Sequence, residues 1–278
     1  MKCHLFAILA VAFCLAGCGS STPSSSTPVH TGITGNWQLA FIPTGAPSGF
    51  AGVTSGVYFT QTGNNVIGIL GSQDAFPLCQ PPTGPPCNFP FGDLNPELVG
   101  TVDAKGNIVL NSVPYTGGSA MLSAVANSPD DTTLSGTYTI TLGAWVAQGT
   151  ISGNTIDTLN GTYSGTLTSQ ETGNIIGVTT TLSQTSSPDS AGELEVSGSA
   201  NFTGSPCFTS TTVPKPGGLL GNQLVVDFVP TNSPTTTIIL SGTLSQDTKT
   251  MSVDYSYGAI NACGSNYGDY GSGTLTLQ

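Results

Sequence analysis

The feature that most constrains this chain is the regular alternation of apolar and small polar residues. In residues 134–142 every second position is apolar or glycine, and each position between them is serine or threonine. The same period of two runs through 33–41, 159–168 and 193–202. A period of two indicates strands with one buried and one wet face, which antiparallel sheets tolerate. The sequence therefore predicts an all-β protein, an antiparallel meander that forms a barrel or a barrel-like sandwich.

A shorter unit, apolar-x-Gly-x-apolar, recurs inside the expected strands and places its glycine on the apolar face. It occurs at 33–37, 98–102, 134–138, 159–163, 196–200 and 240–244. Glycine weakens a strand interior, so its presence needs a reason. Either the glycines let the sheet bend sharply, as barrel corners require, or they make room for a bulky neighbour. The spacing of the units is irregular, which favours successive hairpins over a solenoid or propeller.

Charge is scarce and almost entirely negative. Only 7% of the residues are charged, against about a quarter in ordinary domains, and arginine is absent. The formal net charge is −11, or −12 without Lys2. Because nucleic-acid binding needs clustered cations, this composition excludes it, and it equally excludes a polybasic attraction to anionic lipid.

The N-terminus has the pattern of an export signal. An apolar run over 5–16 follows Lys2; it is too short to span a bilayer but fits the apolar region of a signal peptide. The run ends in Leu15-Ala16-Gly17-Cys18, which resembles the lipobox of bacterial lipoproteins. The resemblance implies that 1–17 is removed and that acyl chains such as palmitate on Cys18 anchor the protein to a membrane.

The same resemblance predicts an extracytoplasmic location in the cell envelope. Gly19 and Ser20 follow the cysteine, without an aspartate, as in outer-membrane lipoproteins. Residues 18–32 are rich in Ser, Thr and Pro and lack hydrophobic periodicity, so we expect a disordered tether after the lipidated cysteine. Residues 33–278 are then expected to form one all-β domain, with a subdivision near 127–131 as the alternative.

Four cysteines besides Cys18 remain after the leader is removed. They are Cys79, Cys87, Cys207 and Cys263. An even number in an exported chain indicates two disulfides. Cys79 and Cys87 flank a short, turn-prone segment, so we expect them to pair, which leaves Cys207 for Cys263. Their spacing does not match a thiolate zinc site, and we expect no metal and no cofactor.

Two groups of aromatic residues are candidate ligand-binding positions. Gly35-Asn36-Trp37 resembles the G-x-W of lipocalins and other calycins, whose tryptophan closes one end of a ligand-holding barrel; the arginine that packs on it in lipocalins has no counterpart here. Near the C-terminus, aromatic rings alternate with amides and carboxylates, as in sugar-binding sites. These rings belong to Tyr255, Tyr257, Tyr267 and Tyr270. For both groups, ordinary core packing is the alternative.

Enzymatic activity is not expected. The only histidine after the leader is His30, in the tether, so a Ser-His-Asp or Cys-His arrangement has no base in the folded part. Three functions remain open: a binding module for an apolar ligand or a glycan, which we favour; a structural or adhesive envelope protein; and a carbohydrate-active enzyme that uses two carboxylates. A cavity lined by Trp37, Tyr138 and Tyr163 would favour the first, a filled barrel the second, and two acids across one cleft the third.

Overall fold

The computed structural model describes residues 32–44, 52–71, 76–79, 87–89, 96–113, 120–142, 145–205, 210–212, 216–231, 237–258 and 268–278. The predicted leader, the predicted tether up to residue 31, Cys207, Cys263 and Tyr267 lie outside these ranges, and Cys79 and Cys87 are described by backbone alone. Among the described residues, no helix has the length and apolarity needed to cross a bilayer.

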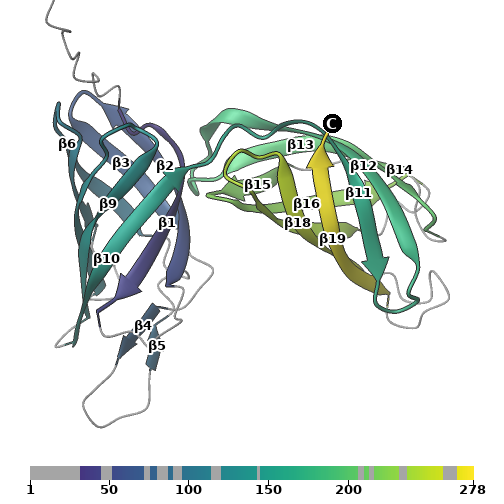
Figure 1. Cartoon of the computed structure of the whole chain (residues 1–278), viewed down its shortest axis with the longest axis horizontal. Coiled ribbons are helices and arrows are strands. Elements are labelled where there is room, and N and C mark those ends of the chain that lie inside the picture. Colours follow the sequence, from purple (N-terminus) through teal and green to yellow (C-terminus); the bar gives the residue numbers. More distant parts are fainter. Residues whose placement is uncertain are drawn as a thin grey trace, which may run out of the picture.

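Within the described part of the chain, eight antiparallel strands close into a first barrel in the order β1-β10-β9-β8-β7-β6-β3-β2 (Figure 1). Its strands are β1 (Gly35–Pro43), β2 (Val53–Thr62), β3 (Asn65–Gly71), β6 (Glu97–Val102), β7 (Asn107–Ser112), β8 (Ala120–Asn127), β9 (Thr133–Leu142) and β10 (Trp145–Thr155).

The remaining large sheet closes a second barrel. Its strands are β11 (Asn160–Ser169), β12 (Ile175–Pro188), β13 (Leu194–Thr203), β14 (Ser210–Thr212), β15 (Gly217–Leu220), β16 (Gln223–Pro230), β17 (Ile238–Leu244), β18 (Thr250–Tyr257) and β19 (Asp269–Leu277). The short strands β14 and β15 each pair with both β13 and β16, so they share one position in the wall. The ring is completed where β11 pairs with both β12 and β19.

The predicted all-β antiparallel barrel fold is thus confirmed, and the chain forms two barrels in succession. The connection between them is the stretch 156–159, which joins β10 to β11. Residues 127–131, where the sequence offered a subdivision, instead lead from β8 to β9, which pair with each other inside the first barrel. Both strands are needed to close that barrel, so no boundary falls between them.

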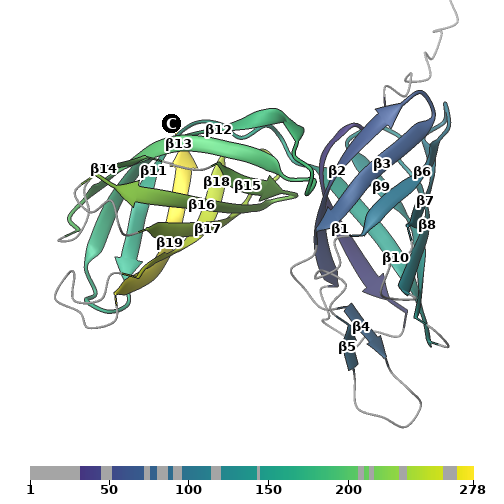
Figure 2. The same ribbon diagram turned by 180° about the vertical axis from the view of Figure 1, so that it is seen from behind.

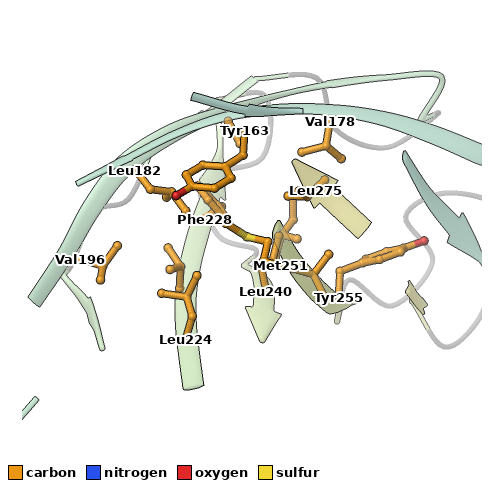
Figure 3. Packing of buried hydrophobic residues seen from close by; sticks show 14 of the residues in the cluster. Tyr163, Val178, Leu182, Val196, Leu224, Phe228, Leu240, Met251, Tyr255 and Leu275 are labelled. Atoms are coloured by element: carbon orange, nitrogen blue, oxygen red, sulfur yellow. The ribbon is translucent and has the colours of Figure 1, made fainter. Parts of the chain in front are cut away.

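Each barrel has its own core, formed by the apolar face of the alternating strands. In the first, Trp37 is fully buried and its ring packs edge-on against Phe59, with 6.3 Å between centroids. In the second, Tyr163, Phe228 and Leu240 belong to one buried cluster, part of which Figure 3 shows. The two clusters share no buried residue, so each barrel buries its own apolar surface.

The inward glycines allow strong coiling of the sheets. A Cβ at Gly100 or Gly136 would collide with a carbonyl oxygen of the next strand, that of Val109 or Val125. Gly198 stands in the same relation to Thr181 in the second barrel. At these positions, sharp bending of the sheet explains the glycine, because the obstacle is backbone and not a side chain.

A separate two-stranded hairpin consists of β4 (Phe76–Cys79) and β5 (Cys87–Phe89). It lies beyond one end of the first barrel, near the ends of β1 and β10 (Figure 1). In its antiparallel register, Cys79 and Cys87 are Cα partners.

Candidate functional site

The two barrels are joined by hydrogen bonds between residues far apart in the sequence. Asn36 is only 5% exposed; its amide nitrogen donates to the carbonyl oxygen of Gly221 at 2.8 Å. Its amide oxygen accepts from the Gly221 N–H at 2.7 Å. Asn222 follows Gly221 in the same turn, and its N–H donates to the side-chain oxygen of Gln38 at 2.9 Å. Two side chains of β1 therefore hold the turn between β15 and β16.

Glycines let the two backbones approach at this joint. A Cβ at Gly56 of β2 would lie 2.5 Å from the backbone carbon and oxygen of Leu220. The Leu220 side chain fills the space where a Cβ of Gly71 would be. A larger residue at Gly56 would push the second barrel away from the first, because the obstacle there is backbone, whereas the Leu220 side chain could turn away from a larger residue at position 71.

A second contact is made where β12 and its following turn reach β2 and β3 of the first barrel. The Tyr58 hydroxyl donates to the carbonyl oxygen of Ser186 at 3.1 Å. The left-handed Gly192, with φ of 85°, lies against the side chain of Ile69. Together with the contacts of the turn between β15 and β16, these interactions define the relative placement of the barrels.

A cleft of about 510 Å³ lies in the angle between the barrels. One wall comes from β1, β2 and β3, and the other from β15, β16 and the residues that immediately precede β13 and β15. Figure 2 shows the end of the second barrel that carries β15 next to the first barrel. Its lining is Gln38, Thr54, Ser55, Gly56, Gly71, Glu193, Pro216, Gly217, Gly218, Leu220, Gln223, Val225 and Asp227. Most of these residues are polar or glycine, so the cleft offers hydrogen-bonding groups beside a similar amount of apolar surface.

Among the described residues that line the cleft, the charged ones are two carboxylates. Asp227 lies on the outer face of β16, and Glu193 lies immediately before β13. The Glu193 carboxylate lies over Gly218, in the space that a Cβ of residue 218 would fill. Partial burial, together with the nearby Asp189 carboxylate, raises the pKa of Glu193.

Some of the remaining polar side chains of the cleft form hydrogen bonds within the protein. The Ser55 hydroxyl donates to the Gly71 carbonyl oxygen at 2.6 Å, and the Gln223 amide donates to Asn222 at 2.9 Å. By contrast, among the described residues neither the Glu193 nor the Asp227 carboxylate has an ion-pair partner; the described ion pair is Lys249 with Asp247. The cleft therefore presents free acceptors more than free donors.

Trp37, a sequence-predicted ligand residue, lies in the first core instead. It is fully buried, and its indole N–H donates to the carbonyl oxygen of Ile33 at 2.8 Å. Tyr138 is in the same core, where burial raises its pKa to about 12, whereas Tyr163 is in the other barrel. None of the three lines the cleft, so the structure does not bring them to a common cavity.

The predicted tyrosine group is divided between the two faces of its sheet. Tyr255 and Tyr257 point into the second core, while Tyr270 is 48% exposed on the outside, and Tyr267 lies outside the described residues. The Tyr255 hydroxyl donates to Asp269 at 2.7 Å; burial, together with this contact, raises the pKa of Tyr255. Strand alternation separates side chains that are close in the sequence, and therefore these rings do not form one exposed surface.

The cleft residues were not identified from the sequence. Glu193, Gln38 and Asp227 belong to no recognisable sequence motif. Only the docking of the barrels brings them together, and no local pattern signals that event. Among the described residues, no group of three or more His, Cys, Asp or Glu side chains could hold a metal ion.

Comparison of the chain with protein-family models, curated proteins and solved structures finds no match.

Proposed function

We propose that this protein is a lipid-anchored binding protein of the bacterial cell envelope, and that it holds a polyhydroxylated ligand, an oligosaccharide, in the cleft between its barrels. The observation that carries the proposal is the cleft itself, about 510 Å³ in volume and lined by amides, hydroxyls and two carboxylates. Ligand sites are concave and are typically found between domains. Sugar hydroxyls supply the donors that free carboxylate oxygens require.

The packed cores favour the cleft over a barrel interior as the ligand site. Both interiors are occupied by large side chains, including Trp37 and Phe59 in one barrel and Tyr163 and Phe228 in the other. An apolar ligand inside a barrel would have to displace these side chains. A glycan in the cleft needs no such rearrangement.

The proposed anchor rests on the lipobox-like segment that ends at Cys18. Two or three acyl chains would supply stable attachment, because each buried CH₂ contributes about 0.8 kcal/mol. The Ser/Thr/Pro-rich segment of residues 18–32 would separate the first barrel from the membrane. The protein would then present the cleft outside the cytoplasmic membrane.

Binding is tested with the full chain, purified in detergent and applied to glycan and lipid arrays. We expect binding to oligosaccharides, and we expect Gln38→Ala, in the cleft wall, to weaken it at least threefold. Asn111→Ala, an exposed substitution in the same barrel, is the control. Binding to neither array would contradict the proposal and leave a structural or adhesive envelope protein as the better interpretation.

A carbohydrate-active enzyme is the second candidate, because two carboxylates line one cleft. Glu193 reaches over Gly218, whose β-sheet partner on β16 is Val225, two residues from Asp227. The strand geometry places the backbones of Gly218 and Asp227 roughly 8 Å apart. A carboxyl group with a raised pKa beside a second acid is the arrangement of a glycosidase acid and its partner.

Hydrolysis of the oligosaccharide that binds distinguishes the enzyme from the binding protein. An enzyme would release shorter products. The Glu193→Gln variant would lose this release, and the Glu195→Gln variant would keep it. The proposed binding protein returns the ligand intact after prolonged incubation.

A further inference from the structure

We infer that the cleft selects ligands that carry ammonium groups, so that its preferred oligosaccharide contains amino sugars. This inference rests on the proposed function and adds the charge of the ligand to it. Its basis is the identity of the charged groups among the described residues that line the cleft: Glu193 and Asp227 are both acidic.

The described lysines leave these two acids unpaired. Lys249 forms a 3.1 Å ion pair with Asp247, and Lys105 lies in the exposed turn between β6 and β7. Lys215 lies outside the described residues. The protein itself thus supplies no described cation to the cleft, and its negative net charge attracts cations and repels anions over longer distances.

The environment of Glu193 adds to this electrostatic preference. Partial burial and the Asp189 carboxylate both disfavour its ionised form, which raises its pKa. An ammonium group in the cleft would offset both effects, because an opposite charge at short range favours the ionised carboxylate. A uronic acid or a phosphate in the same place would add a third or fourth negative charge.

Hydrogen bonding points to the same ligand class. The free groups described above are carboxylate oxygens, which only accept hydrogen bonds. An ammonium group offers three donors, and sugar hydroxyls offer one each. An oligosaccharide of amino sugars would therefore satisfy the cleft by both charge and hydrogen bonding, whereas an N-acetylated sugar would satisfy it by hydrogen bonding alone.

The test compares two ligands that differ in the acetyl group. The full chain in detergent is titrated calorimetrically with a β-1,4-linked glucosamine tetramer and with its N-acetylated counterpart, at pH 6, in low salt and with EDTA. We expect the glucosamine tetramer to bind about fivefold more tightly, a modest factor because the ion pairs are partly exposed. The preference should shrink in 0.5 M NaCl, since salt screens exposed charges.

Matched variants assign the preference to the two acids. Glu193→Gln with Asp227→Asn should equalise the two affinities. Glu195→Gln with Asp254→Asn changes the same number of charges on exposed strand positions outside the cleft and should leave the preference intact. Equal effects of the two double variants would show that only net charge matters and would overturn the inference.

The remaining outcomes separate the inference from the proposed function. Equal binding of the two tetramers to the unmodified protein would overturn the inference and keep the proposed function. Absence of binding by both tetramers, together with failure on the arrays, would overturn both. Spermine is the final probe: if it binds as tightly as the glucosamine tetramer, the charge preference holds and the need for hydroxyl groups is contradicted.

Discussion

The side chain of Asn36 and the backbone of Gly221, 185 residues apart in the chain, form a reciprocal pair of buried hydrogen bonds between the two barrels. Asn36 precedes Trp37 on β1, so strand alternation turns it outward while the tryptophan faces the core. It is nevertheless buried, because the second barrel covers it. The position is thus on the surface of one barrel and in the interior of the whole protein.

Replacing Asn36 with alanine should weaken the joint. The substitution leaves both the N–H and the carbonyl of Gly221 without partners in a buried place, which costs about 1–3 kcal/mol. Guanidinium denaturation should show this loss in the free energy of unfolding, and small-angle scattering should show a less compact particle. Asn111→Ala, at an exposed position, should change neither; equal behaviour of the two variants would contradict the prediction.

Gly56→Ala should separate the barrels without unfolding them. The added Cβ would lie 2.5 Å from the backbone of Leu220, and backbone atoms cannot move aside without shifting the turn. We expect faster cleavage by proteinase K within 156–159 and at least a threefold loss of oligosaccharide affinity. Gly258→Ala is the control, because open space surrounds that position. If proteinase K cleaves the Gly56→Ala variant within 156–159 no faster than it cleaves the original protein, this prediction is wrong.

Acid should destabilise the protein through two exposed turns. Asp130 accepts hydrogen bonds from the backbone of Thr132 and Thr133, which lower its pKa from 3.8 to about 2. Hydrogen bonds from Ser245 and Lys249 lower the pKa of Asp247 to about 2 as well. Because the folded-state pKa is depressed, the contribution to stability is complete above 3.8 and is lost as the pH falls through about 2.

The denaturation midpoint measured between pH 6 and pH 2 tests this prediction. It should fall mainly below pH 4, and a variant with both Asp130→Asn and Asp247→Asn should show a flatter dependence in that window. The matched variant Glu195→Gln should retain the original slope. An unchanged slope in the double variant would place the acid sensitivity elsewhere.

Cys79 and Cys87 should form a disulfide. Their Cα atoms are partners in the β4–β5 hairpin, and the sequence had already favoured this pairing. Digestion without reduction, followed by mass spectrometry, should recover a cross-linked peptide pair that contains both residues, and a second pair that joins Cys207 to Cys263. Recovery of Cys79 linked to either of the other two would show the predicted connectivity to be wrong.

Cys18 should carry the membrane anchor. Cells grown with radioactive palmitate should label the protein, and Cys18→Ala should abolish both the labelling and the partition into detergent. Cys14→Ala, within the leader, should leave the labelled product unchanged. Retention of label by Cys18→Ala would mean that the acyl chains are attached elsewhere or that the lipobox resemblance is misleading.

Local pattern was sufficient to predict the strands and their faces. Leu134, Tyr138 and Ile140 are buried, and Ser135 and Thr137 between them are exposed, as the period of two requires. These features depend on neighbours in the chain, so the sequence by itself determined them.

Only the tertiary structure decided how many barrels form and where the cleft lies. The eight-position rings close when β1 meets β10 and when β11 meets β19, pairings that no strand encodes alone. Gln38, Glu193 and Asp227 come together because an outward asparagine and a glycine on separate barrels allow close docking. A site built from contacts between residues more than 150 positions apart leaves no local period or motif, and its chemistry becomes visible only after the chain has folded.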